Sequence, residues 1–145
     1  MQKILGLGAA IGIACGGLAE AGDSAAMIRD FGLLGTWASY CSSGYNARQP
    51  GLRIVFADPP GAAPTYTTVN AEGGVATMVR SAVLEAAPAG AGQLRLRLRI
   101  IRGDRDGSPL PSPTTNTFEQ VIEKVEGQGI RLVGIDPRFI QKCPN

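Results

Sequence analysis

The chain has 145 residues, with 14 Lys and Arg against 12 Asp and Glu, for a net charge of +2. A balance this near zero produces no large field to attract nucleic acid or an anionic membrane, so we expect no nucleic-acid partner. The sequence contains no histidine, and the two cysteines expected in the mature chain are predicted to pair with each other. Together these exclude ordinary zinc and haem sites and His-based acid–base chemistry. We therefore expect neither a metal nor another cofactor.

Residues 1–21 have the pattern of a secretory signal peptide. Lys3 is followed by an almost uncharged run from Ile4 to Leu18 and then by the small-x-small site Ala19-Glu20-Ala21. A membrane anchor is the alternative, but the apolar run of about 15 residues is shorter than the roughly 20 needed to span a bilayer. We expect cleavage after Ala21, which leaves residues 22–145 as a single domain. This domain is then expected to be periplasmic or secreted.

A lipoprotein signal acylated at Cys15 is a further alternative for this segment. Gly12-Ile13-Ala14-Cys15 lacks the large aliphatic residue that such sites carry three positions before the cysteine. After cleavage at Ala21, no transmembrane segment is expected in the remaining chain.

Two cysteines, Cys41 and Cys143, remain after removal of the signal peptide. An even number of cysteines in an exported chain predicts a disulfide, and with two candidates its pairing is unambiguous. The first strand and the C-terminus must then lie side by side.

A short helix is expected ahead of the first strand. Ser24 suits an N-cap for Ala25–Phe31, and Gly32 suits the end of the helix. A frayed terminus is the alternative for the first of these residues.

Strands are predicted from alternating and β-branched residues separated by Gly, Pro and Asn turns. The clearest is Gln93–Arg102, with leucines on one face and arginines on the other. A helix is the alternative for Val75–Ala86. Seven strands are expected, with an eighth if Arg138–Gln141 pairs; the seven are Gly35–Cys41, Leu52–Phe56, Thr65–Asn70, Val75–Ala86, Gln93–Arg102, Asn116–Glu126 and Ile130–Ile135.

Short connections make sequential strands neighbours and predict an up-and-down antiparallel meander. An open meander leaves two unpaired edges. Closure into a barrel removes both edges and also brings Cys41 to Cys143. The expected fold is an all-β barrel of seven or eight strands with a short N-terminal helix.

The charged residues predict no catalytic centre. Arg95, Arg97 and Arg99 are expected to form a solvated outer face paired with Glu119 or Glu123, with an anion-binding stripe as the alternative. Asp104–Gly107 has too few ligands for a calcium loop and predicts a turn. Because no pair of carboxylates is marked as a dyad, we expect that the protein is not an enzyme.

Gly35-x-Trp37 on the first strand, after a short helix and before a β-meander, resembles the lipocalins and other calycin-like barrels. The longer run Gly-Thr-Trp-Ala-x-x-Cys is similar to short exported bacterial proteins of unassigned function. The resemblance implies that Trp37 fills one end of the barrel beside Gly35, with Arg131 stacked on its ring. The second lipocalin motif, of Thr-Asp-Tyr type, is missing, and the chain is shorter than typical ligand carriers.

Two functions are consistent with this resemblance. The first is an extracytoplasmic lipocalin-like binding protein for a small, mostly apolar molecule, with Tyr40, Tyr45 and Tyr66 near the mouth. The second is a protein-interaction barrel, such as an inhibitor of a secreted protease or lysozyme, because such barrels also resemble bacterial metalloprotease inhibitors. Residues 22–31, 42–51 and 103–115 would then contact an exported protein partner.

Overall fold

The computed structural model describes residues 21–42, 50–111 and 116–145, with the side chains of residues 21 and 22 left out. The expected signal peptide and the alternative acylation at Cys15 lie outside the described residues, except for Ala21 itself. Both stay predictions.

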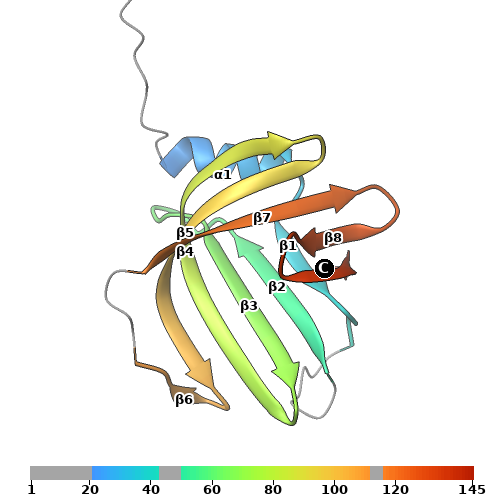
Figure 1. Cartoon of the computed structure of the whole chain (residues 1–145). Helices are drawn as coiled ribbons and strands as arrows, with labels where there is room; N and C mark the ends of the chain where they lie inside the picture. Colours follow the sequence, from blue (N-terminus) through green and yellow to red (C-terminus); the bar gives the residue numbers. More distant parts are fainter. Residues whose placement is uncertain (1–20, 43–49, 112–115) are drawn as a thin grey trace, which may run out of the picture.

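The strands form a closed antiparallel barrel (Figure 1). Around it run β1, β2, β3, β4, β5, β7, β8 and β9, and β9 pairs again with β1. β6 is a two-residue extension that pairs with the far end of β5. This confirms the predicted up-and-down barrel, with eight strands in the ring. The elements are α1 Ala21–Asp30, β1 Gly35–Ala38, β2 Gly51–Ala57, β3 Thr65–Glu72, β4 Val75–Gly90, β5 Gln93–Arg105, β6 Ser108–Pro109, β7 Thr117–Val125, β8 Gly129–Leu132 and β9 Asp136–Lys142.

Two hairpins differ from the sequence-based boundaries. β4 continues through Pro88, which was expected in a turn, because the chain reverses only at Ala91-Gly92 and Gly90 still pairs with Gln93. β8 ends at Leu132, so Ile135 lies in the following turn instead of a strand. β9 begins at Asp136, where a strand was expected to end.

The segment 103–115, which lies between two predicted strands, is itself partly strand. β5 extends to Arg105, and Asp106-Gly107 turns the chain into β6. Both turn residues have positive φ, 48° and 79°, as a type I′ hairpin requires. The Asp106 carboxylate also accepts a hydrogen bond from the Ala76 amide at 2.9 Å. The turn predicted for Asp104–Gly107 is confirmed only for Asp106-Gly107, because Asp104 and Arg105 belong to β5.

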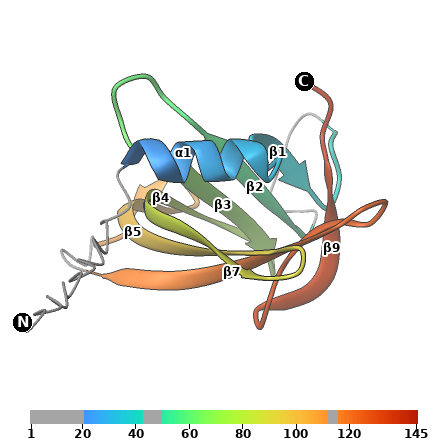
Figure 2. The same cartoon turned by 90° about the horizontal axis from the view of Figure 1, so that it is seen from above.

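The helix α1 lies across one end of the barrel (Figure 2). Ile28 and Leu33 are fully buried there. Gly32 ends the helix as predicted, with a φ of 79°, and the Leu33 amide donates to the Ile28 carbonyl at 3.1 Å. The expected N-cap at Ser24 is wrong, because the helix begins three residues earlier and places Ser24 inside it.

Trp37 fills this end of the barrel beneath the helix. Its indole N–H donates to the Leu33 carbonyl at 2.8 Å, and only 4% of its surface is exposed. Gly35 has a φ of 115°, a conformation that side chains with a Cβ rarely adopt. We call this the closed end of the barrel.

The cation over Trp37 is Lys142, with its ammonium nitrogen 5.8 Å from the ring centroid. Lys142 reaches the ring because it pairs directly with Trp37 across β9 and β1. The expected stacking of Arg131 on Trp37 is therefore wrong. Arg131 lies on β8 directly opposite Glu123, binds that carboxylate at 2.7 Å and covers the ring of Phe139.

Glu123 receives two side-chain donors at this position. Hydrogen bonds from Gln93 first and then the charge and hydrogen bond of Arg131 lower the pKa of the Glu123 carboxyl. The carboxylate therefore stays ionised and joins β5, β7 and β8 on the outside of the barrel.

The predicted disulfide between Cys41 and Cys143 is confirmed, with its two Cα atoms 5.3 Å apart. It joins the segment after β1 to the segment after β9. Next to it, the Cys143 amide donates to the Thr36 carbonyl at 2.8 Å. Covalent and hydrogen bonding thus close the barrel at the same seam.

We expect the double change Cys41→Ser and Cys143→Ser to lower the free energy of unfolding substantially. Chain entropy over the 102 residues between the cysteines predicts a loss of about 4 to 5 kcal/mol. Guanidinium denaturation of both proteins measures it. Adding a reductant must shift the wild-type midpoint and leave that of the double variant unchanged; equal midpoints for the two oxidised proteins would contradict the closing role.

Candidate functional site

The barrel is hollow at the end opposite α1, where a cavity of about 420 Å³ opens between the strands. It lies where β2, β4 and β7 begin and where β3, β5 and β8 end. We call this the open end. The cavity is lined by Leu52, Tyr66, Thr68, Asn70, Val79, Ile100, Phe118, Glu119, Gln120, Leu132 and Ile135.

Strand register explains why these side chains meet. On the inner face, Thr68 lies between Ile54 of β2 and Val79 of β4. The neighbouring row places Tyr66 beside Ser81 of β4, and Ser81 beside Ile100 of β5. Alternation along each strand then keeps every second residue inside.

A second hollow of about 310 Å³ adjoins the cavity at the rim. The two share Leu52, Asn70, Leu132 and Ile135. Ile135 is 71% exposed although it is apolar. The open end is therefore a continuous opening with an apolar residue at its edge.

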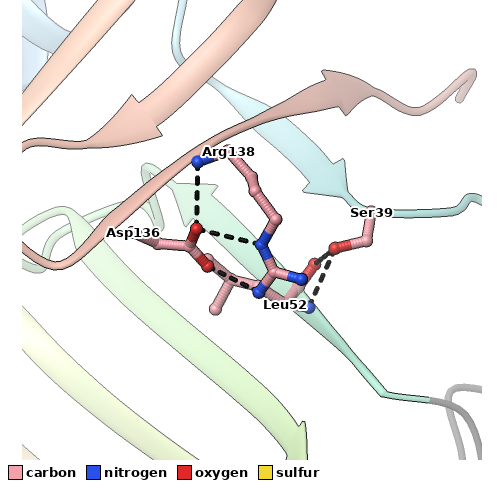
Figure 3. Close-up of polar contacts among 4 residues, drawn as sticks. All are labelled: Ser39, Leu52, Asp136 and Arg138. Atoms are coloured by element: carbon pink, nitrogen blue, oxygen red, sulfur yellow. Dashed lines mark hydrogen bonds and ion pairs between the residues drawn. The ribbon is translucent and has the colours of Figure 1, made fainter.

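An ion pair borders this opening (Figure 3). Arg138 donates through Nε and Nη2 to the two carboxylate oxygens of Asp136, at 3.0 and 2.8 Å. The Arg138 amide also donates to Asp136, at 2.9 Å. These hydrogen bonds lower the pKa of the Asp136 carboxyl. Figure 3 shows the Arg138 guanidinium extending toward Leu52 of β2. The Leu52 amide donates a hydrogen bond to the Ser39 hydroxyl.

Tyr66 is the aromatic residue at the bottom of the cavity. It is 3% exposed, and its ring packs against Phe56 with the centroids 5.2 Å apart. Burial raises the pKa of the Tyr66 hydroxyl. The hydroxyl therefore stays protonated and remains a hydrogen-bond donor at neutral and mildly alkaline pH.

Two further polar side chains lie deep in the barrel. Ser81 is fully buried, and its hydroxyl has no hydrogen-bond partner among the described residues. Gln120 is 8% exposed, lines the cavity and donates from its amide nitrogen to the Val121 carbonyl at 3.0 Å. A buried hydroxyl without a partner costs about 1 to 3 kcal/mol, so Ser81 needs an explanation.

The three tyrosines expected near a mouth lie in different places. Tyr66 lines the cavity. Tyr40 is half-buried after β1 and is not among the lining residues that the structure describes. Tyr45 falls in 43–49, outside the described residues. The sequence prediction missed Gln120, which lines the cavity, and Ser81, which pairs with Tyr66 across β3 and β4. Both positions follow from contacts between strands that no local pattern shows.

The arginines of β5 lie on the outer surface as expected. Arg95 is 3.9 Å from Glu119, and Arg97 is 3.6 Å from Glu85. Their side chains are about half exposed (49% and 50%), so these pairs add little stability. The pairing with Glu119 is confirmed, whereas Glu123 binds Arg131 instead.

Among residues 21–42, 50–111 and 116–145, no group of three or more Cys, Asp or Glu side chains is placed to hold a metal. Asp104 of the acidic turn sequence binds Arg102 at 3.1 Å. No helix in the described part of the chain has the length and apolar character needed to span a bilayer. Comparison of the chain with protein-family models, curated proteins and solved structures finds no significant match.

We expect Ser81→Ala to raise the free energy of unfolding by about 1 kcal/mol, because it removes a buried hydroxyl that lacks a partner. Ser39→Ala is the matched control. Its hydroxyl accepts a hydrogen bond from the Leu52 amide at 3.0 Å, so this change should lower stability by about 0.5 to 1 kcal/mol. Urea denaturation measures both changes; destabilisation by Ser81→Ala would mean that its hydroxyl has a partner in the free protein.

Proposed function

We propose that the protein is a lipocalin-like, extracytoplasmic binding protein for a small, mostly apolar ligand, and that it is not an enzyme. The observation that carries this proposal is the cavity of about 420 Å³ at the open end. Small-molecule sites usually measure about 300 to 1,000 Å³ and are mostly apolar, with a few placed polar groups. The volume and lining of this cavity agree with both properties.

The architecture supports the same function. Helix α1 and Trp37 close one end of the barrel, whereas the other end stays open. Eight-stranded barrels are wide enough to hold one small ligand. A ligand entering at the open end meets an apolar wall formed by Leu52, Val79 and Phe118.

The disulfide supports an extracytoplasmic location, because disulfides persist in oxidising compartments and are rare in the cytosol. The signal-peptide pattern of residues 1–21 points the same way.

The alternative, an inhibitor of a secreted protease or lysozyme, uses residues 22–31 to enter the cleft of its target. In the structure these residues belong mostly to α1, and Ile28 is fully buried against the barrel. A segment that packs on its own core is less available to a partner. This observation supports ligand binding as the better proposal.

We expect Thr68→Phe to weaken ligand binding at least tenfold. Thr68 lines the cavity, and a larger side chain there occupies the volume that a ligand needs. Fluorescence titration with diphenylhexatriene, a hydrocarbon that becomes emissive in apolar sites, measures the affinity. Thr67→Phe is the matched control, because Thr67 is also half-buried but lies on the opposite face of β3.

Thr67→Phe should bind the probe like the wild type. Equal binding by the two variants and the wild type would place the probe outside the cavity and would contradict the proposal.

A further inference from the structure

Three arginines lie close together on the outer face of β4 and β5. Arg80 of β4 pairs directly with Arg102 of β5, and Arg99 of β5 pairs with Ala82, which follows Arg80 on the same face of β4. All three arginines are exposed. Directly opposite residues of an antiparallel pair have Cβ atoms about 5 Å apart, and long side chains also reach their diagonal neighbours. We call Arg80, Arg99 and Arg102 the arginine cluster.

A β-bulge brings Arg102 into this cluster. Side chains alternate between the two faces of a regular strand, so Arg102, three residues after the outward Arg99, would point into the barrel. The register between β4 and β5 shifts after Arg80, which leaves Ile101 as an extra residue on β5. This extra residue returns Arg102 to the outer face, opposite Arg80. Bulges are common next to functional sites, where they redirect a side chain.

The charge of the arginine cluster is only partly balanced. Like charges directly opposite each other destabilise a sheet, and Arg80 and Arg102 form such a pair. Within the described residues, the acidic partner of the cluster is Asp104, which binds Arg102 through Nε at 3.1 Å. The side chains of Arg80 and Arg99 form no hydrogen bond or ion pair with any residue that the structure describes. Three guanidinium groups and one carboxylate leave a local charge of +2.

Other carboxylates of the chain do not supply the missing charge. Glu85 and Glu119 lie on the same outer face, but they pair with Arg97 and Arg95. Outside the described residues the sequence has one acidic residue, Glu20, which belongs to the expected signal peptide. A further counter-ion for the arginine cluster must therefore come from outside the chain.

We propose that the arginine cluster binds a phosphate group, held between the guanidinium groups of Arg80, Arg99 and Arg102. Guanidinium groups donate paired hydrogen bonds to the oxygens of phosphate. Asp104 holds Arg102 through Nε, which leaves its two Nη atoms to donate to the phosphate. The site lies on the outer face of the barrel, so it is separate from the cavity, and the inference goes beyond the proposed function.

Calorimetric titration of the disulfide-bonded protein with inorganic phosphate at pH 8 and low ionic strength tests the proposal. We expect saturable binding at one site, weakened about three- to tenfold by Arg80→Gln and by Arg99→Gln, because each change removes one charged donor. Arg53→Gln is the matched control. Arg53 lies on β2 between the inward Leu52 and Ile54, has no partner among the described residues and carries the same charge. This variant should bind phosphate like the wild type.

Absence of saturable phosphate binding by the wild type would overturn the proposal. An equal loss in Arg53→Gln would also overturn it, because net charge alone would then explain the binding. Sedimentation with phosphatidylcholine vesicles that contain phosphatidic acid distinguishes two sources of the phosphate group. Vesicle binding that Arg80→Gln and Arg99→Gln both weaken identifies a lipid headgroup, whereas phosphate binding without vesicle binding identifies a soluble phosphate.

Discussion

Closure of the barrel at the seam between β1 and β9 is the constraint on which the rest of the structure depends. Without the pairing of Trp37 with Lys142, β1 and β9 would both be exposed edges. The Cys41–Cys143 disulfide holds the same seam covalently. Because the strands form a ring, their inner faces enclose one interior, and every second side chain contributes to it. The cavity follows from that enclosure.

The two ends of this ring have different roles. At the closed end, α1, Leu33 and Trp37 fill the interior with apolar groups and satisfy the indole N–H. At the open end the strands spread without a covering helix (Figure 1). The packed end therefore buries most of the apolar surface, whereas the open end keeps the space. Buried hydroxyls without a partner among the described residues occur on both α1, at Ser24, and β4, at Ser81. Such a division between the two ends is common in binding proteins. A rigid scaffold supports the site, and the protein is less stable than it would be if side chains filled that site.

The lining of the cavity is the feature on which the proposed ligand rests. Most of its side chains are apolar, and Tyr66, Thr68, Asn70, Glu119 and Gln120 add polar groups. This composition suits the small, mostly apolar ligand that we propose. Arg95 and Arg97 of β5 do not take part, since they lie on the opposite face of the strand and pair with Glu119 and Glu85.

The sequence by itself determined the strand-rich fold and the pairing of the cysteines, because alternation, turn residues and cysteine count are local signals. The place of Trp37 at a barrel end came from the resemblance of Gly35-x-Trp37 to the lipocalins. The sequence also predicted the outward face of Arg95 and Arg97. Only the tertiary structure decided which cation covers Trp37 and which residues face the cavity. Lys142 and Ser81 acquire their neighbours through pairing between strands, and register depends on contacts between segments far apart in the chain, which no local pattern records.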